Sequence, residues 1–179
     1  MRSGPQTFIT TVKSLWKRGS DKRDRLLRRE SLGFAMKAVH VLNGPNLNLL
    51  GTREPATYGT ATLADIEASL QAKAKAAGVA LTFRQSNHEG DLVDWIQEAG
   101  KSGAGVLLNA GAFTHTSIAL HDAIKGSGAI VVELHLSNVF AREPFRHHST
   151  LSAVAKGVIC GFGEASYTLA FDAILHHLP

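Results

Sequence analysis

The sequence has one cysteine, Cys160, and this scarcity excludes several kinds of protein. A lone cysteine forms no internal disulfide and no multi-cysteine metal site, so nothing in the chain requires an oxidising compartment, and we expect it in the cytoplasm. Every apolar run is far shorter than the roughly 18 to 20 residues that a membrane helix requires. The near-zero mean hydropathy and 7% aromatic content are those of a soluble globular protein without a membrane partner.

The basic residues are not spread evenly along the chain. The net charge is +4, but residues 1–35 hold nine Lys and Arg against three Asp and Glu. Subtracting these from the totals of 19 and 15 leaves ten basic and twelve acidic side chains in residues 36–179. The body of the chain is therefore slightly acidic, and we expect no nucleic-acid partner.

The sequence predicts two parts: a basic extension at 1–35, disordered or marginally helical, and a folded domain at 36–179. The extension lacks the continuous apolar core of a secretory signal. An organellar transit peptide stays open. Strand-like sequence begins directly after Met36, which favours an upstream start codon as the origin of the extension and Met36 as the functional start.

From residue 37 onward, short apolar runs alternate with helical patterns. The strands are expected at 38–42, 79–83, 106–108, 130–134 and 157–159, and the helices at 63–77, 91–99, 117–125 and 167–177. The strand runs have no polar face, which is typical of strands buried on both sides. Thr62 with Asp65 predicts a helix N-cap, and Gly78, Gly100 and Gly126 stand where helix C-caps belong.

This alternation predicts an α/β fold, a flavodoxin-like open five-stranded parallel sheet with helices on both faces. The strand order is not determined by the sequence. In such sheets, ligands bind beyond the carboxyl ends of the strands. Polar clusters follow four of the expected strands, at 43–46, 84–88, 109–111 and 135–138. We therefore expect the functional site at this end of the sheet.

Two pairs of side chains indicate acid–base chemistry. Glu133 and His135 are two residues apart on an expected strand, so they share a face, and the carboxylate can hold the imidazole in one tautomer as a general acid. A charge in a buried strand is costly, which favours function over a core glutamate neutralised by a cation. Tyr58 lies in the long first loop near Arg53, and a cation lowers a tyrosine's pKa. Alone, Tyr58 would be read as a solvent-facing aromatic.

The third expected strand leads into a segment whose Thr and Ser residues open a helix, and helix N-termini bind carboxylates and hydroxyls. His115 in this segment is either a satisfied loop histidine or a ligand group. Asp122 follows seven residues later on the same helical face, where a solvated carboxylate is the commoner reading. No histidine spacing matches a metal site and no phosphate or dinucleotide loop occurs, so we expect neither metal nor cofactor.

Taken together, these motifs resemble those of the type II 3-dehydroquinate dehydratases. The motifs occur in one order at 42–51, 53–55, 58–59, 84–87, 109–111, 114–117, 133–138, 142–143 and 145–146. The resemblance covers residues 37–177. It implies a hydro-lyase that eliminates water from 3-dehydroquinate in the anti sense, through an enolate, to give 3-dehydroshikimate. The reaction belongs to the shikimate pathway of aromatic amino acid biosynthesis or to quinate catabolism, and needs no Schiff base or metal.

The resemblance also implies roles for individual residues. Tyr58 corresponds to the base that removes the C2 proton, and Arg53 to the lid residue that favours its anionic form. His135 corresponds to the general acid for the departing C1 hydroxyl and Glu133 orients it, while Asn46 holds a water at the enolate oxygen. The substrate positions implied are Asn109, His115, Asp122, Leu136, Ser137 and Arg146.

Members of the family assemble as trimers that associate into dodecamers, in which an aspartate at the Asp122 position reaches a neighbour's site. The resemblance implies the same homo-oligomer here. Phe140 and His147 depart from residues that family members often carry, which leaves the rim contacts open. The main alternative is a non-catalytic flavodoxin-like module that binds a small acid, although binding alone needs no proton-transfer groups. A hydrolase or another lyase is a weaker alternative, because no acyl-transfer motif occurs.

Overall fold

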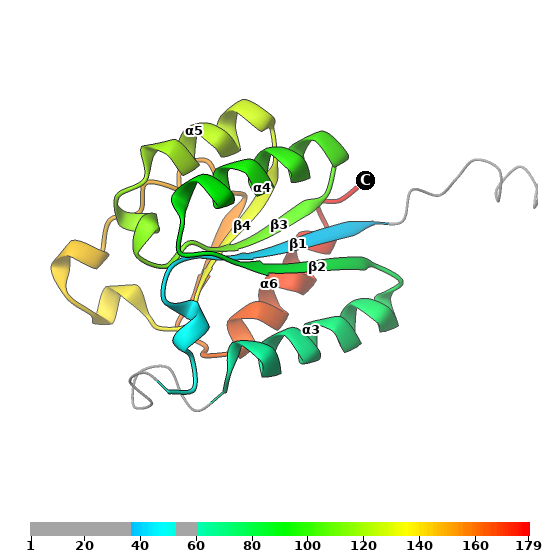
Figure 1. Ribbon diagram of the computed structural model, residues 1–179, viewed down its shortest axis with the longest axis horizontal. Helices are drawn as coiled ribbons and strands as arrows, with labels where there is room; N and C mark the ends of the chain where they lie inside the picture. The colour runs from blue at the N-terminus through cyan, green and yellow to red at the C-terminus, as the bar shows by residue number, and fades with distance from the viewer. Residues whose placement is uncertain (1–36, 53–60) are drawn as a thin grey trace, which may run out of the picture. The chain divides into compact units, whose positions relative to one another are not determined.

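The computed structural model describes residues 37–52 and 61–179, and these form one parallel sheet with helices on both faces (Figure 1). The strands are β1 (Ala38–Asn43), β2 (Ala80–Gln85), β3 (Gly105–Asn109), β4 (Ile130–His135) and β5 (Gly157–Cys160). Their order in the sheet is β2-β1-β3-β4-β5, and every pairing is parallel. The flavodoxin-like fold is confirmed, and the strand order that the sequence left open is now known.

Two helices cover each face of the sheet. Helices α3 (Leu63–Ala77) and α6 (Ala165–Leu175) lie on one face, and α4 (Glu89–Ser102) and α5 (Ile118–Ser127) lie on the other (Figure 1). Short 3-10 helices lie in the connections: η1 (Leu47–Leu49), η2 (Gly111–His115), η3 (Val139–Ala141) and η4 (Pro144–Arg146). None of the helices in the described residues is long and apolar enough to cross a membrane.

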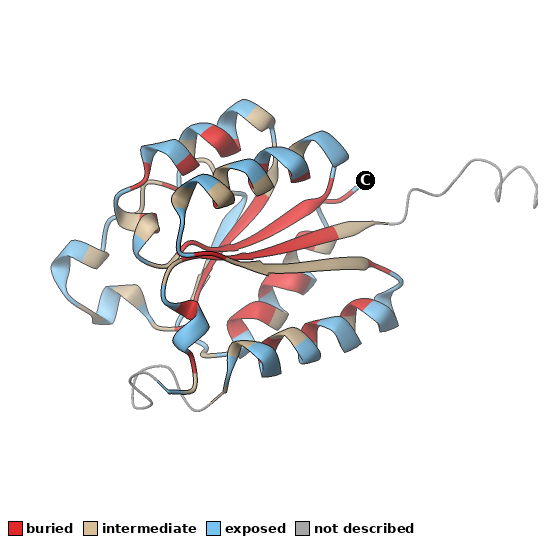
Figure 2. Cartoon of the chain, in the orientation of Figure 1, coloured by how far each residue is buried: buried red, intermediate tan, exposed pale blue. Residues whose placement is uncertain are grey.

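The core consists of two apolar layers, one on each side of the sheet. Because successive strand residues point to opposite faces, Val39 and Val41 of β1 pack in the layer with α3 and α6, while Leu42 packs in the layer with α4 and α5. Figure 2 shows that β1, β3 and β4 are almost wholly buried. The expectation of two-sided burial is wrong for β2 and β5, because these strands form the edges of the sheet.

The helix ends confirm part of the predicted capping. Thr62 Oγ1 accepts a hydrogen bond from Asp65 N at 3.2 Å, and Asp65 Oδ2 accepts one from Thr62 N at 2.9 Å, which forms a capping box. Gly78 ends α3 in the left-handed conformation, as expected. The prediction was wrong for two other glycines, Gly100 and Gly126, which lie inside their helices.

Helices α4 and α5 end instead at Gly103 and Gly128, both with positive φ. Gly100 has a packing role that the local sequence did not reveal. A Cβ atom at Gly100 would lie 2.7 Å from Cβ of Ser127, so its absence allows α4 and α5 to approach closely. Gly126 has open space around it, and its position in α5 follows from the helix continuing one residue further to Ser127.

The loops after β1 and β3 are held against each other. Gly44 N donates to Asn109 O at 2.8 Å, and a Cβ atom at Gly44 would lie only 2.4 Å from the carbonyl oxygen of Ala110. Only glycine allows this approach. The contact brings the first polar loop beside the segment that follows β3.

His40 of β1 is a buried polar residue with an unsatisfied hydrogen-bonding atom. The residue is 7% exposed, and its Nδ1 has no hydrogen-bond partner among the described residues. Burial lowers the pKa of His40, the charge of Glu98 raises it, and the charge of Arg84 lowers it, with a net decrease. Glu98 and Arg84 are paired with each other at 2.7 Å. The folded chain therefore favours a neutral His40.

We predict that this histidine makes the fold less stable as the pH falls below about 6.5. The unfolded chain takes up a proton at the ordinary histidine pKa, whereas the folded chain resists protonation until a lower pH. In urea unfolding at fixed protein concentration, His40→Leu should show a flatter loss of stability between pH 7 and pH 5 than the wild type. His177→Leu, at the exposed end of the chain, should keep the wild-type slope. Equal slopes for His40→Leu and wild type would contradict the prediction.

Candidate active site

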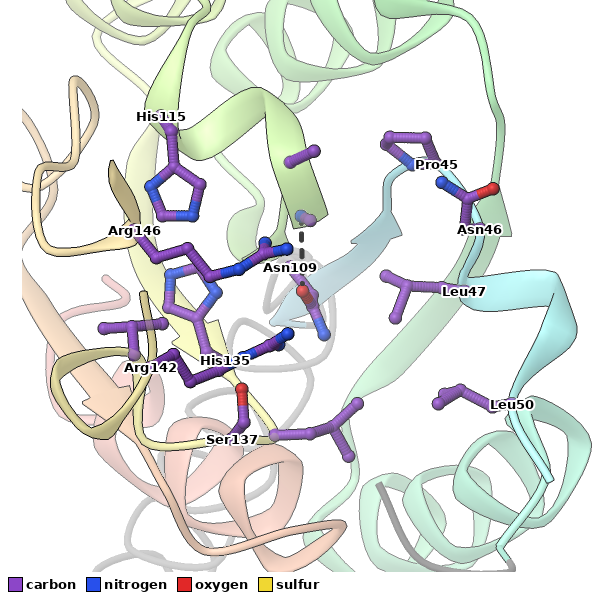
Figure 3. A pocket seen from close by; sticks show the side chains of 14 residues that line it. Pro45, Asn46, Leu47, Leu50, Asn109, His115, His135, Ser137, Arg142 and Arg146 are labelled. Atoms are coloured by element: carbon purple, nitrogen blue, oxygen red, sulfur yellow. Dashed lines mark hydrogen bonds between the residues drawn. The ribbon is translucent and has the colours of Figure 1, made fainter. Parts of the chain in front are cut away.

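A cavity of about 130 Å³ lies beyond the carboxyl ends of β1, β3 and β4 (Figure 3). Its lining comes from the segments that follow these strands: residues 45–50 after β1, 109–115 at and after β3, and 135–146 at and after β4. This is the end of the sheet where the sequence places its polar clusters. The strand order explains the convergence, because β1, β3 and β4 are consecutive in the sheet.

Glu133 and His135 form the central pair of the site. Both belong to β4 and point to the same face, as the strand period predicts, and His135 Nε2 lies 2.9 Å from Glu133 Oε1. Glu133 is fully buried and His135 is 7% exposed. Since an ionised carboxylate only accepts hydrogen bonds, Nε2 carries the shared proton and the ring is held in one orientation. His135 lines the cavity.

Three hydroxyl groups complete the surroundings of Glu133. Thr114 Oγ1 donates to Oε1 at 2.8 Å, Ser149 Oγ donates to Oε1 at 2.9 Å, and Ser152 Oγ donates to Oε2 at 2.7 Å. Burial alone would raise the pKa of Glu133, but hydrogen bonds from His135, Ser152 and Thr114 outweigh it and hold the pKa below its ordinary value. The carboxylate is therefore ionised at neutral pH.

Two arginines bring positive charge to the cavity. Figure 3 shows the side chains of Arg142 and Arg146 extending into it beside His135. Glu143 Oε2 lies 2.9 Å from Nε of Arg146 and 3.5 Å from Nε of Arg142, so one carboxylate contacts both. Guanidinium groups match carboxylates and other anions, and the cavity is suited to an anionic ligand. The sequence motifs imply a substrate role for Arg146 and none for Arg142, which lies four residues earlier.

Asn109 and His115 also line the cavity. Asn109 Nδ2 donates to Tyr167 OH at 2.9 Å, and Gly111 N donates to Asn109 Oδ1 at 3.4 Å (Figure 3). His115 Nδ1 lies 2.8 Å from the carbonyl oxygen of His148, which makes Nδ1 the donor and leaves Nε2 as the acceptor. The two readings of His115 are therefore compatible, because a satisfied loop histidine also lines the cavity.

The other residues that the sequence predicts for the site differ in where they lie. Asn46, Leu136 and Ser137 line the cavity, and the Asn46 backbone has a left-handed conformation at φ 65° with its N–H donating to Asn87 Oδ1 at 2.9 Å. Tyr58 and Arg53 lie outside the described residues.

Asp122 is exposed on α5 and lines a separate surface hollow with Gln97 and Lys101. The expectation that Asp122 and His115 share a face of one helix is wrong. His115 belongs to η2, whereas α5 begins at Ile118 with Ser117 as its N-cap.

The fold and the cavity define an α/β enzyme for acid–base chemistry on a small molecule. Residues 37–175 match the family described as "Dehydroquinase class II", and the chain belongs to that family. Among the described residues, no group of three His, Cys, Asp or Glu side chains is arranged to hold a metal ion.

Relatives with curated names support the same family. The 3-dehydroquinate dehydratase of Azorhizobium caulinodans is 69% identical over 141 residues, which cover 79% of this chain and 95% of the relative. That of Brucella canis is 63% identical over 138 residues, covering 77% and 88%. The crystal structure of type II dehydroquinase from Propionibacterium acnes matches with a TM-score of 0.75 and 41% identity, covering 78% and 97%.

We predict that Thr114→Val destabilises the fold in a pH-dependent way. The substitution keeps the shape of the side chain and removes one donor to a buried carboxylate, which costs about 1.5 to 3 kcal/mol of unfolding free energy at pH 7. Glu133 stabilises the fold above its unfolded pKa of 4.5, and this contribution is lost as the pH falls through its lower folded-state pKa. The difference between wild type and variant should therefore shrink at pH 4.

The measurement is chemical denaturation at both pH values. Thr116→Val is the matched control, because Thr116 is exposed two residues away in the chain. Its effect on unfolding should be small and equal at pH 7 and pH 4. A Thr114→Val effect of the same size at both pH values would mean that the lost bond does not act through the charge of Glu133.

Proposed function

We propose that this chain catalyses the elimination of water from 3-dehydroquinate to give 3-dehydroshikimate, with His135 as the general acid. The observation that carries this proposal is the buried Glu133–His135 pair, joined at 2.9 Å in a cavity that two arginines also line. The family match and the relatives at 63–69% identity support the same activity. The chain is thus a hydro-lyase of the type II 3-dehydroquinate dehydratases.

The elimination requires a base, an acid and a group that stabilises the enolate oxygen. Because Glu133 occupies Nε2 of His135, the other ring nitrogen, Nδ1, is the atom that delivers a proton to the departing C1 hydroxyl. The C–O electron pair leaves with that oxygen, which takes the proton and becomes water. Glu133 acts through His135 and is a positioning residue. We assign the water that neutralises the enolate oxygen to Asn46.

The base is assigned from the sequence motif. Tyr58, as a phenolate, removes the C2 proton, and the electron pair of that C–H bond forms the enolate before the hydroxyl departs. Arg53 favours the phenolate because a nearby cation stabilises the ionised form.

The substrate carries one carboxylate and several hydroxyl groups, and the cavity offers partners for both. We assign the carboxylate to the backbone N–H groups of Leu136 and Ser137, and the hydroxyl groups to Asn109, His115 and Arg146. These side chains lie around one cavity with His135 (Figure 3). The positive charge of the arginines also raises the local concentration of an anionic substrate.

We predict that the ultraviolet absorbance of 3-dehydroquinate solutions rises when the protein is added, because the product gains a conjugated enone carboxylate. The rise should persist with a chelator. His135→Gln should lower kcat by about 10²- to 10⁴-fold, the usual contribution of a general acid, and Tyr58→Phe should abolish the rise. His177→Gln, at an exposed position far along the chain, should match the wild type.

Each failure has its own meaning. No rise with folded wild-type protein would refute the dehydratase assignment and favour the alternative of a small-acid binding module. Normal turnover by His135→Gln would keep the reaction and refute the assigned acid. Normal turnover by Tyr58→Phe would refute the assigned base.

We further propose that residues 36–179 form the catalytic domain, with residues 1–35 as an extension, and that the protein is a cytoplasmic homo-dodecamer built as a tetramer of trimers. Asp122 contacts substrate in a neighbouring subunit; its exposed position outside the cavity of its own chain supports this proposal. The domain boundary agrees with the family match, which begins at residue 37.

Deletion of residues 1–35 should leave kcat/KM within about twofold of the full chain, because every residue assigned to the reaction lies after residue 36. Sedimentation equilibrium should give twelve chains per particle for both proteins. A dodecamer that dissociates on deletion would assign the extension to assembly. A large loss of activity in an intact dodecamer would refute the domain boundary.

A further inference from the structure

Tyr167 of α6 has a buried hydroxyl group between two asparagine side chains. The hydroxyl donates to Oδ1 of Asn43 at 2.6 Å and accepts from Nδ2 of Asn109 at 2.9 Å. Tyr167 and Asn43 are fully buried, and Asn109 is 3% exposed. Burial raises the pKa of Tyr167 well above its ordinary value, so the hydroxyl keeps its proton. The three side chains join α6 to the ends of β1 and β3.

The backbone groups at the two ends of this series of hydrogen bonds determine which atom donates in each of them. At one end, Asn43 Nδ2 donates at 3.0 Å to the backbone carbonyl oxygen of Arg84, which can only accept. Asn43 therefore turns Oδ1 toward Tyr167, and the single hydroxyl proton is donated there. At the other end, the backbone N–H of Gly111, which can only donate, lies 3.4 Å from Asn109 Oδ1.

The Tyr167 oxygen can then only accept from Asn109, which must present Nδ2 to it. Reversal of the Asn109 amide would place Oδ1 against a hydroxyl oxygen whose proton is already committed, and would place two donors against each other at Gly111. One arrangement of protons satisfies all four contacts. The amide orientation of Asn109 is therefore determined by partners deep in the core.

We propose that Tyr167 is a positioning residue that, together with Asn43, holds the amide of Asn109 in one orientation at the cavity wall. This inference rests on the proposed function, in which Asn109 contacts a substrate hydroxyl. The substrate then always meets the same two groups of Asn109: the second hydrogen of Nδ2, which is not donated to Tyr167, and the lone pair of Oδ1 that Gly111 does not use. Such preorganisation removes the cost of ordering the amide at the moment of binding. We call the hydrogen-bonded side chains of Asn43, Tyr167 and Asn109 the relay, and we expect it to act on substrate binding more than on the chemical step.

Tyr167→Phe tests the relay, because it keeps the ring and removes only the hydroxyl. We expect the KM for 3-dehydroquinate to rise about tenfold while kcat changes less than about threefold, since the proton-transfer groups are untouched. The pH dependence of kcat should not move. The double variant Tyr167→Phe/Asn109→Ala should have the same kcat/KM as Asn109→Ala alone, because Tyr167 acts only through that amide.

Two further variants separate positioning from stability. Phe171→Leu changes a fully buried residue one turn later in α6, so it lowers stability without removing a polar group, and its KM should stay at the wild-type value. Asn43→Ala leaves Tyr167 in place but frees its proton to turn toward Asn109, and it should raise KM as Tyr167→Phe does. Asn43→Ala also provides the test if Tyr167→Phe does not fold.

A wild-type KM in both relay variants would overturn the inference while leaving the proposed function intact. Additive losses in the double variant would also overturn it, because they would show that Tyr167 acts independently of Asn109. A rise in KM for Phe171→Leu equal to that for Tyr167→Phe would reduce the relay to general core stability. Absence of turnover by the wild-type chain would overturn the proposed function and the inference together.

Discussion

The buried negative charge of Glu133 is the constraint on which the rest of the site depends. An ionised carboxylate in a protein interior is costly unless all of its hydrogen-bonding capacity is used. Here the donors come from three places: His135 on the same strand, Thr114 in η2, and Ser149 and Ser152 beyond η4. Satisfying one charge therefore joins the segments that follow β3 and β4.

This arrangement also accounts for the position of the two arginines. The chain leaves the sheet at His135, passes through η3 and η4 with Arg142 and Arg146, and returns to Glu133 at Ser149 and Ser152. The Glu133 carboxylate thus contacts both ends of the loop that carries the positive charge. Glu133 therefore links the position of His135 to the positions of Arg142 and Arg146.

A second buried polar network ends at the cavity-lining Asn109 and follows the same physical rule. The Asn43, Tyr167 and Asn109 side chains satisfy one another, and the relay ends at backbone groups whose donor or acceptor character cannot change. The parallel pairing of β1 with β3 places Asn43 directly beside Asn109, at the ends of the two strands. Both networks convert buried polar groups into defined orientations of cavity-lining side chains.

Local periodicity in the sequence determined the alternation of strands and helices, the capping box at Thr62, and the shared face of Glu133 and His135, because each depends on residues a few positions apart. The tertiary structure alone decided the strand order and the helix ends at Gly103 and Gly128. It also decided that Thr114, Ser149 and Ser152 donate hydrogen bonds to Glu133, and that Tyr167 accepts one from Asn109. These contacts join residues from 16 to 58 positions apart, and no local pattern encodes which distant side chain will satisfy a buried polar group.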